Sequence, residues 1–518
     1  MEFIEEALGH RVVPQAKYDS EGQKKRECYR ETREGVLDEI KQWTDIYSDT
    51  ENCWWITGGP GVGKSTIGAK VAKIFKHEKC LYAQYFTTRN IADTTDPENI
   101  IPTMAQQLAK MSPLAALVIQ DKLKTTPPSD VDELSVRQAE VLLLEPLRAI
   151  SQHVSKVVVV IDGVDEFANA DPCVLSKVTS VLCSIMLDLP ANVKFFIFSR
   201  PEHWITANIP RHIKRLDLAT EDSEDDVDRL VRAKLNNLAE FYEWNDWPSE
   251  HQVSLLCRLA AGHLGLAAAA LRWIARQLYF TGSAGRDNVF ERVSQLGMGE
   301  IDELYTFILD TILPPPQDPD RKCYLERLRT VLGCLVVLQE PLDIGSISTL
   351  LSLDDFDVLH CMKRISSLIV DGTEPLTERT VPQVHKSLVD YLVSDRAHSD
   401  LRIDLTEQHH SLTTSCLGVI QRLTFNVGHI TTSLYSAWIF FISQLNTYAC
   451  KWLVCHLENG GERATLVPDL ENFMKAHFLQ WLEVLSLERL VYSVAVSKLK
   501  IFEKLVKVTI PLPTKYSY

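Results

Sequence analysis

The chain has 518 residues, of which 45% are hydrophobic and 24% are charged. This length and composition predict about three or four globular domains and exclude a fibrous or wholly disordered protein. The net charge of −15, from 69 acidic and 54 basic residues, argues against direct binding to nucleic acid or to an anionic membrane.

The cysteines and the N-terminus indicate a cytoplasmic protein. The 12 cysteines include no C-x-x-C pair, as expected for reduced core thiols. Cys450, Cys455 and His456 lie together in an apolar helical stretch. We expect buried helix residues there and not a metal site, because a four-ligand set is missing. The acidic start MEFIEEALGH does not resemble a signal peptide, and no apolar run reaches the ~18 residues of a membrane span.

The first predicted element is a helix over residues 30–43, after a polar leader. Thr32 is its expected N-cap. Its apolar face consists of Val36, Leu37, Ile40 and Trp43. This spacing predicts that the helix packs against the domain that follows.

Residues 58–65 read GGPGVGKS and fit G-x-x-x-x-G-K-[ST], the phosphate-binding P-loop. An apolar, β-prone run precedes the motif and a helical pattern follows it, as the motif requires. Glycines let successive N–H groups point at a phosphate, and the helix adds the positive end of its dipole. Lys64 supplies a positive charge, and the Ser65 hydroxyl can ligate magnesium.

Two later strands are predicted to end in charged residues. The buried run 157–161 ends in Asp162, followed by Asp165 and Glu166. The next run ends in Ser199 and Arg200. Carboxyl ends of parallel strands are where ligands bind in open α/β sheets. Asp162 is therefore a candidate magnesium partner, and Arg200 a candidate phosphate contact. A solvated acidic turn and a surface arginine are the alternatives.

Strand candidates at 80–86 and 215–220 complete a doubly wound, mostly parallel α/β domain. Beyond residue 218 the pattern becomes helical. Residues 327–393 predict three short helices, two short strands around a turn near Gly372, and a further helix, which is the order of a winged helix. His385 lies where the last strand meets that helix. From residue 401 onward only amphipathic helices are predicted, with no repeat of fixed period.

The motifs GGPGVGKST, VVVVIDGVDE and FFIFSR together resemble those of NACHT-domain P-loop NTPases of the signal-transduction STAND class. The lead-in TREGVLDEIKQW and the segment HKSLVDYL are similar to fungal members, of the nephrocystin-3-like N-terminal type, related in outline to innate-immune receptors. The resemblance implies five segments: a leader at 1–28, the NTPase domain at 29–218, a helical domain at 219–313, a winged-helix-like domain at 325–395, and a helical region at 400–518.

The resemblance also implies roles for individual residues. It implies that ATP or ADP binds to one continuous run of residues and to His385, which would contact the ADP β-phosphate. That run is Gly58, Gly59, Pro60, Gly61, Val62, Gly63, Lys64, Ser65 and Thr66. Ser65 and Asp162 would hold magnesium. Asp165 or Glu166 would orient the hydrolytic water, and Arg200 would act as the sensor arginine.

Two positions depart from the patterns of related proteins. Gly163 stands where many related ATPases have a glutamate, so slow hydrolysis is expected. The family's Gly-Leu-Pro turn near the adenine reads Gly265, Leu266 and Ala267 in this chain, which puts that contact in doubt.

The function implied by the resemblance is a switch that is closed with ADP and open and homo-oligomeric with ATP. Protein partners would bind through the helical region or a repeat array. Two alternatives remain open at this point: a turnover ATPase of AAA-like type, and a scaffold with a degenerate nucleotide site. The intact Lys64, Ser65 and Asp162 argue against the scaffold.

Overall fold

The computed structural model describes residues 1–20, 29, 32–46, 52–89, 91–211, 213–221, 223–294, 301–315, 317–369, 384–424, 442–461, 464–488 and 490–496. Two compact units make up the chain, Met1–Phe307 (unit 1) and Ile308–Tyr518 (unit 2). Unit 1 contains the parallel sheet, and the described part of unit 2 is almost entirely helical.

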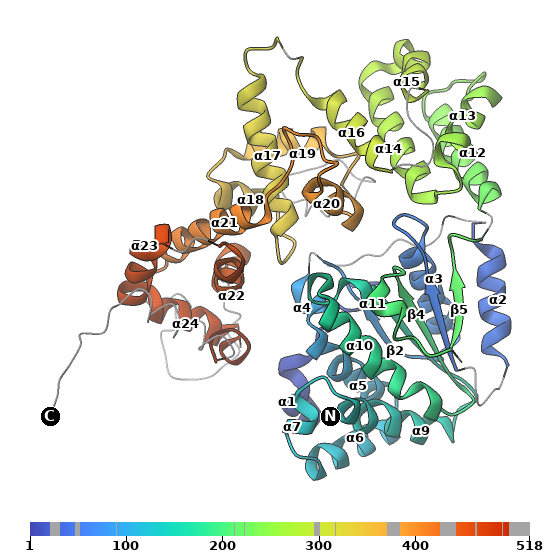
Figure 1. Ribbon diagram of the computed structural model, residues 1–518, viewed down its shortest axis with the longest axis vertical. Coiled ribbons are helices and arrows are strands. Elements are labelled where there is room, and N and C mark those ends of the chain that lie inside the picture. The colour runs from blue at the N-terminus through green and yellow to red at the C-terminus, as the bar shows by residue number, and fades with distance from the viewer. Residues whose placement is uncertain are drawn as a thin grey trace. The chain divides into compact units, whose positions relative to one another are not determined.

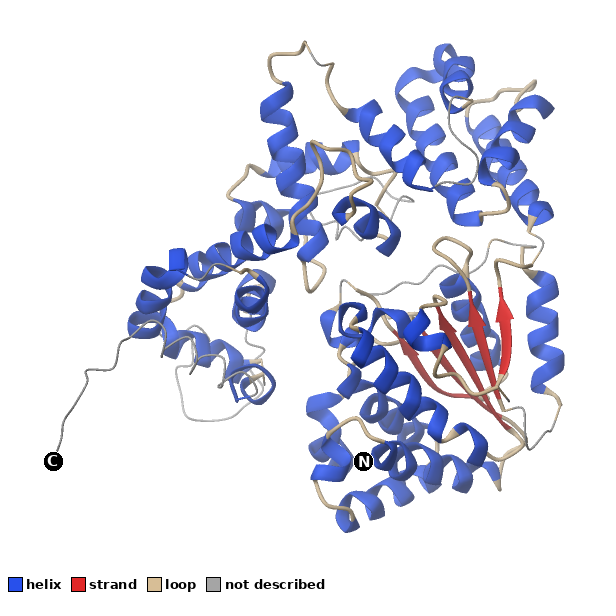
Figure 2. Ribbon diagram, viewed as in Figure 1, coloured by secondary structure: helices blue, strands red, loops and turns tan. Residues whose placement is uncertain are grey.

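Five strands in unit 1 form one sheet in the order β2-β3-β4-β1-β5 (Figure 1). They are β1 (Cys53–Thr57), β2 (Leu81–Phe86), β3 (Val157–Asp162), β4 (Val193–Ser199) and β5 (Lys214–Asp217). All four strand pairings are parallel, so the carboxyl ends of the strands meet at one edge, as Figure 2 shows. The predicted parallel α/β core is confirmed.

Both faces of the sheet are covered by helices, which explains why its strands read as continuous apolar runs. Because side chains alternate along a strand, Trp54 and Trp55 of β1 enter different cores. Trp54 packs with residues of α2 (Glu34–Thr44) and α3 (Lys64–His77). Trp55 lies in the core on the other face. The helices that contribute to that second core include α1 (Glu2–Leu8), α5 (Ile100–Met111), α6 (Pro113–Thr125), α9 (Glu145–Ser151) and α10 (Pro172–Ser184).

Short helices connect these elements: α4 (Ala92–Thr95), α7 (Ser129–Asp132), α8 (Val136–Ala139) and α11 (His203–Thr206). After β5, unit 1 continues with α12 (Glu224–Phe241), α13 (Glu250–Ala260), α14 (Leu264–Thr281) and α15 (Arg286–Val293). The boundary between the units falls within α16 (Ile301–Ile312).

Unit 2 continues with α17 (Arg321–Val337), α18 (Ile344–Leu351), α19 (Asp355–Arg364), α20 (Lys386–Val393), α21 (Leu405–Ile420), α22 (Gln444–Asn459), α23 (Val467–Asn472) and α24 (Phe478–Leu487). Between α19 and α20, Ile369 and Val384 form an antiparallel bridge. The predicted turn near Gly372 lies outside the described residues.

The predicted N-cap of the first long helix is wrong. Helix α2 begins at Glu34, and its N-cap is Arg33, which has a left-handed φ of 58°. The hydroxyl of Thr32 instead donates to the Tyr29 carbonyl at 2.7 Å. This hydrogen bond from the Thr32 side chain to the Tyr29 carbonyl has replaced the expected cap.

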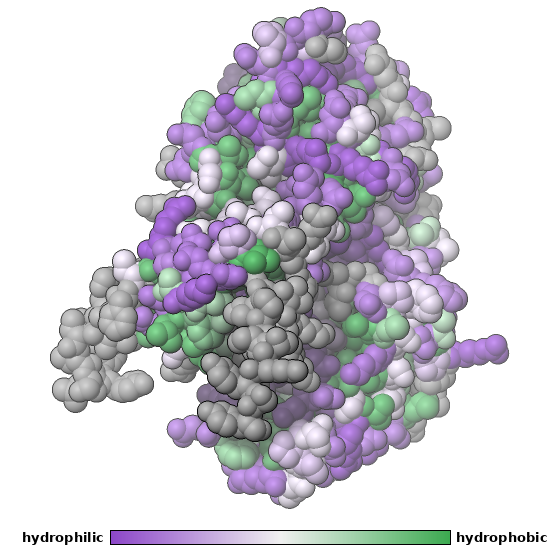
Figure 3. Space-filling model, turned by 60° about the vertical axis from the view of Figure 1, so that its left-hand side comes forward, coloured by the Kyte–Doolittle hydropathy of each residue, from purple (hydrophilic) through white to green (hydrophobic). Residues whose placement is uncertain are grey.

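Hydrophobic and hydrophilic residues are interspersed on the molecular face in Figure 3. Among the described residues, no helix combines the length and the apolar character needed to cross a membrane.

Candidate functional site

The loop between β1 and α3 has the geometry that a phosphate-binding motif needs. Strand β1 ends at Thr57 and α3 begins at Lys64. Gly61 and Gly63 have φ values of 79° and 97°, which glycine adopts at little cost. A Cβ atom on Gly58 would come within 2.6 Å of Val62 Cγ2. Only glycine fits at these turns, so the loop can curl over the N-terminus of α3.

The ammonium group of Lys64 lies against the loop itself. Its Nζ donates hydrogen bonds to the carbonyls of Gly58 and Gly59, at 2.7 and 2.8 Å. Burial lowers the pKa of Lys64 from 10.5 to about 8, and the charges of nearby carboxylates oppose that shift. A partly desolvated cation next to a helix N-terminus favours an anionic ligand.

Asp162 lies at the end of β3 with 1% of its surface exposed. The residue after it, Gly163, has a φ of 83°, and its N–H donates to the Phe198 carbonyl at 3.0 Å. A Cβ atom there would lie 3.1 Å from Thr87 Cβ. A glutamate at this position would therefore be strained, which gives a physical reason for glycine.

Asp165 is bound to Arg200, the residue that follows β4. The backbone N–H of Arg200 donates to Asp165 Oδ1 at 2.9 Å, and its Nε lies 3.5 Å from Oδ2. Asp165 is 2% exposed and the Arg200 side chain is 16% exposed, so the ion pair is partly shielded from solvent. The neighbouring acid, Glu166, accepts a hydrogen bond from the Arg89 backbone N–H at 3.0 Å.

The candidate residues of the strand ends gather around Lys64. Four charged groups act on its ammonium: three carboxylates raise its pKa and one guanidinium lowers it. They belong to Asp162, Asp165, Glu166 and Arg200. The sheet thus brings together groups from β3, β4 and the P-loop that are far apart in sequence. Ser199, the last residue of β4, is fully buried and accepts a hydrogen bond from the Trp55 indole at 2.9 Å.

His385 belongs to unit 2, where it caps α20. Its Nδ1 accepts from the Ser387 backbone N–H at 3.2 Å and lies 2.6 Å from the Ser387 hydroxyl oxygen. The side chain is exposed. The sequence did not suggest this capping role, because histidine is not a usual N-cap residue. Contact of His385 with a nucleotide stays a prediction.

Two contacts on the P-loop come from residues whose role the sequence left unassigned or in doubt. Gly265, at the start of α14, donates from its N–H to the Gly61 carbonyl at 2.8 Å. Arg33 donates from Nη2 to the Val62 carbonyl at 3.1 Å. The Gly-Leu pair of the family turn is the sequence feature that points to Gly265. No sequence pattern points to the contact made by Arg33.

The family model described as "Nephrocystin 3, N-terminal" matches residues 31–200. The matched segment begins shortly before α2 and ends at Arg200, so it includes the P-loop and the acidic strand end. No curated protein matches the chain.

Similar solved structures include the Drosophila ORC bound to DNA, at 13% identity and a TM-score of 0.33, covering 75% of this chain and 90% of that one. A Walker-type ATPase of Pyrococcus abyssi has 13% identity and a TM-score of 0.33, covering 70% and 97%. A Thermotoga maritima RuvB variant has 9% identity and a TM-score of 0.26, covering 70% and 95%.

Proposed function

We propose that this protein is a nucleotide-dependent signalling switch of the STAND class, closed with ADP and open and oligomeric with ATP, which hydrolyses ATP slowly. The observation that carries the proposal is the set of charges around Lys64. Three carboxylates and one guanidinium act on an ammonium group at the N-terminus of α3. That combination at the carboxyl edge of a parallel sheet suits a magnesium-bound polyphosphate.

Binding of the phosphates would fall to the loop Gly58–Thr66. Its N–H groups and the α3 dipole attract negative charge. Lys64 would exchange its bonds to the Gly58 and Gly59 carbonyls for bonds to phosphate oxygens. A phosphate anion is the better partner for an ammonium group whose pKa burial has lowered.

The donor set suits magnesium, because the Ser65 hydroxyl and the Asp162 carboxylate are hard oxygen ligands. When bound, magnesium would neutralise charge on the phosphates and polarise them. Asp162 is nearly fully buried, and a buried carboxylate is stabilised by a cation nearby. These residues therefore fit the ion that the motif implies.

Slow hydrolysis follows from the environment of the two acids that could orient water. Asp165 is held by the backbone and the guanidinium of Arg200. Glu166 is held by the Arg89 N–H. A water molecule would have to compete with these donors for the carboxylate oxygens of both acids. A protein that keeps its nucleotide for a long time is better suited to switching than to turnover.

The rest of the proposal extends to unit 2. The segment 325–395, with His385, would be a winged-helix-like domain that holds ADP in the closed form. The limits 29–218, 219–313 and 400–518 are proposed for the NTPase, helical and C-terminal domains. Exchange of ADP for ATP would release the clamp and allow homo-oligomers to form. Protein partners would bind through the helical or repeat regions, in the cytoplasm, without direct contact with nucleic acid.

The deciding experiment is to purify the full chain, denature it, and identify and count the released nucleotide. We expect close to one ADP per chain. Rapid ATP turnover by a nucleotide-free preparation would indicate the turnover ATPase instead, and absence of both ADP and ATP binding would indicate the degenerate scaffold.

Lys64→Ala tests the site itself. We expect affinity for a fluorescent ADP analogue to fall at least about a hundredfold, because charge-assisted hydrogen bonds to phosphate are lost. The matched control is Lys322→Ala, which removes the same charge from a side chain that is 89% exposed in α17. Equal affinities for the two variants would contradict phosphate binding by Lys64.

A further inference from the structure

Two carbonyl groups of the P-loop accept hydrogen bonds from outside the loop. The Gly61 carbonyl accepts from the Gly265 N–H, at the start of α14, at 2.8 Å. The Val62 carbonyl accepts from the Arg33 guanidinium, just before α2, at 3.1 Å. Both donors belong to unit 1.

These two bonds control the direction of the amide groups that a phosphate would meet. Each carbonyl shares a planar trans peptide with the N–H of the next residue, and the two groups point in opposite directions. Gly265 therefore orients the Val62 N–H, and Arg33 orients the Gly63 N–H. A bound phosphate and the external donors hold opposite ends of the same two peptide units.

Arg33 is itself anchored on α12. Its backbone N–H donates to Asp226 Oδ2 at 3.0 Å, and its Nε lies 3.9 Å from the same oxygen. Arg33 is 3% exposed and Asp226 is 9% exposed, so little solvent screens the pair. Arg33 also holds a left-handed φ of 58°, which is unfavourable for a residue with a Cβ atom and needs such contacts to persist.

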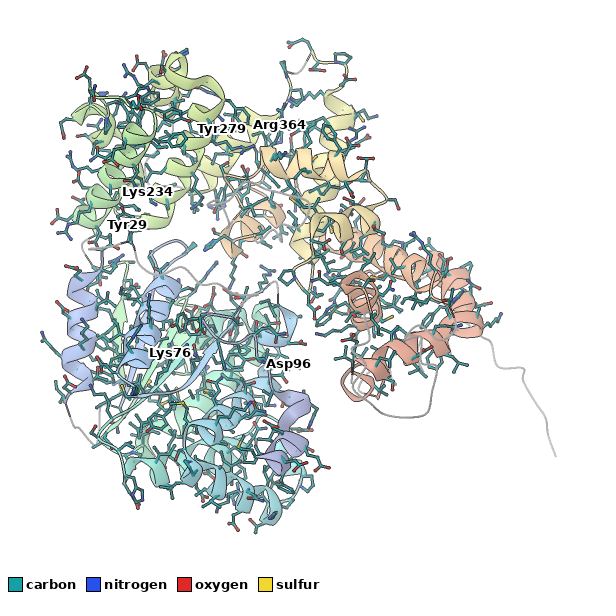
Figure 4. All side chains as sticks on the ribbon, turned by 180° about the vertical axis from the view of Figure 1, so that it is seen from behind. Tyr29, Lys76, Asp96, Lys234, Tyr279 and Arg364 are labelled. Carbon is teal, nitrogen blue, oxygen red and sulfur yellow. The ribbon has the colours of Figure 1, made fainter. Side chains whose placement is uncertain are left out.

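The same lead-in segment contacts α12 a second time. Lys234 Nζ lies 5.1 Å from the centre of the Tyr29 ring, a cation–π contact. Figure 4 shows Tyr29 and Lys234 next to each other. Tyr29 in turn accepts hydrogen bonds at its carbonyl from the N–H and the hydroxyl of Thr32. Tyr29 thus contacts α12, and Arg33 contacts both α12 and the P-loop.

Helices α12 and α14 are also joined at their N-terminal ends. The hydroxyl of Ser223, the N-cap of α12, donates to the Gly262 carbonyl at 2.6 Å. Gly262 lies three residues before Gly265. A displacement of α12 would therefore be transmitted to the Val62 carbonyl through Arg33. It would also be transmitted to the Gly61 carbonyl through Gly265.

We infer that Arg33 is a positioning residue that couples the phosphate-binding backbone of the P-loop to α12 and α14, with Asp226 as its anchor and Gly265 as the second contact. The inference rests on the proposed binding of nucleotide by Gly58–Thr66. It adds the route by which that binding reaches the helical part of unit 1. Phosphate binding fixes the loop peptides, which strengthens the bonds on their carbonyl side and holds the two helices.

Hydrogen exchange followed by mass spectrometry on the full chain, with and without ADP, tests the coupling. In the wild-type chain ADP should slow exchange about tenfold or more in the P-loop peptide and in α12 and the start of α14. In Arg33→Met, ADP should still protect the P-loop peptide, while protection of α12 falls to about twofold or less. Arg33→Lys keeps the charge beside Asp226 and should restore part of that protection.

A second variant keeps the test decisive if Arg33→Met does not fold. A Cβ atom on Gly265 would lie 2.6 Å from Gly61 Cα and 2.7 Å from Gly61 O, so Gly265→Ala should separate α14 from the loop. Its matched control is Gly418→Ala, in α21, where a Cβ atom meets nothing within 4 Å. We expect Gly265→Ala to lose ADP-dependent protection of α14, and the control to keep it.

The outcomes separate this inference from the function on which it rests. If ADP protects α12 and α14 as strongly in Arg33→Met and Gly265→Ala as in the wild-type chain, the coupling is wrong while nucleotide binding stands. If ADP fails to protect the P-loop peptide of the wild-type chain, nucleotide binding is wrong, and the coupling is rejected with it.

Discussion

At the scale of single residues, Gly163 has a backbone conformation that other residues adopt only at a cost. Its φ is 83°, and a Cβ atom would lie 3.1 Å from Thr87 Cβ. The peptide leads directly from Asp162 toward Asp165, which is bound to Arg200. The chain therefore turns sharply between Asp162 and Asp165. A glycine is the residue that allows this turn.

We expect Gly163→Ala to destabilise the folded chain by about 1–3 kcal/mol, from the left-handed φ and the close Thr87 contact. Thermal unfolding followed by fluorescence would measure the change. Gly418→Ala is the control, because its site in α21 is open and alanine there favours the helix by roughly 0.5–1 kcal/mol. An unchanged melting temperature for Gly163→Ala would contradict the argument from φ.

The roles of single residues are easiest to predict at positions where only one residue type can serve. The P-loop motif predicts which residues lie at the N-terminus of α3, because few residue types can replace the glycine, lysine and serine at its fixed positions. It could not identify Arg33, since nothing in the local spacing distinguishes a buried arginine from a surface one. Nor could it show that Asp165 is engaged by Arg200, because that contact depends on the order of strands β3 and β4.

At the scale of elements, buried strands were easy to predict and helix ends were harder. Runs such as Val157 to Ile161 are apolar throughout, because helices cover both faces of the sheet. The start of α2 was misassigned because Thr32 is a good cap by type, whereas Arg33 is held in the capping position by Asp226. Long-range contacts override local propensity at such ends.

Helices α21 and α22 are joined by a pair of histidines, of which His456 is buried and His409 is partly buried. His409 Nδ1 lies 2.9 Å from His456 Nδ1, and His456 Nε2 lies 2.9 Å from the Tyr448 hydroxyl. Burial lowers the pKa of His456 to about 3 and that of His409 to about 4. Both histidines are therefore neutral in the folded chain at pH values where they would be charged when unfolded.

This histidine pair predicts acid sensitivity. Below the ordinary value of 6.5 the unfolded chain binds protons that the folded chain does not, so stability falls as the pH drops from about 6.5 toward 4. The loss should reach a few kcal/mol. Urea unfolding of the full chain at several pH values, followed by exchange of α21 and α22 amides, would measure it.

His456→Phe should flatten that pH dependence in α21 and α22, while His251→Ala, which removes an exposed histidine of α13, should not. An unchanged slope in His456→Phe would show that other groups cause the acid sensitivity.

At the scale of the whole molecule, the proposed switch depends on His385. Because His385 caps α20, His385→Ala would alter both the cap and the imidazole. His385→Asn is the sharper variant, since asparagine is a good N-cap residue but lacks the ring. We expect ADP to dissociate about tenfold to a hundredfold faster, through loss of a hydrogen bond to a charged phosphate.

Stopped-flow displacement of a fluorescent ADP analogue would give the rate. The control is His251→Asn, which exchanges an exposed histidine of α13 in the same way. Equal dissociation rates for wild-type and His385→Asn chains, with unchanged melting temperature, would refute the clamp while leaving phosphate binding by the P-loop intact.

The amino-acid sequence alone determined the parallel α/β core, the glycine-rich loop before α3 and the acidic strand end. These features depend on local regularities: apolar runs for strands covered on both faces, and glycines at fixed spacing before a helix. Only the tertiary structure decided which charges face one another. The Arg33–Asp226 contact joins residues 193 positions apart, and the Gly265 contact on Gly61 depends on how α14 packs. Such contacts are set by the packing of whole elements, to which local sequence patterns are insensitive.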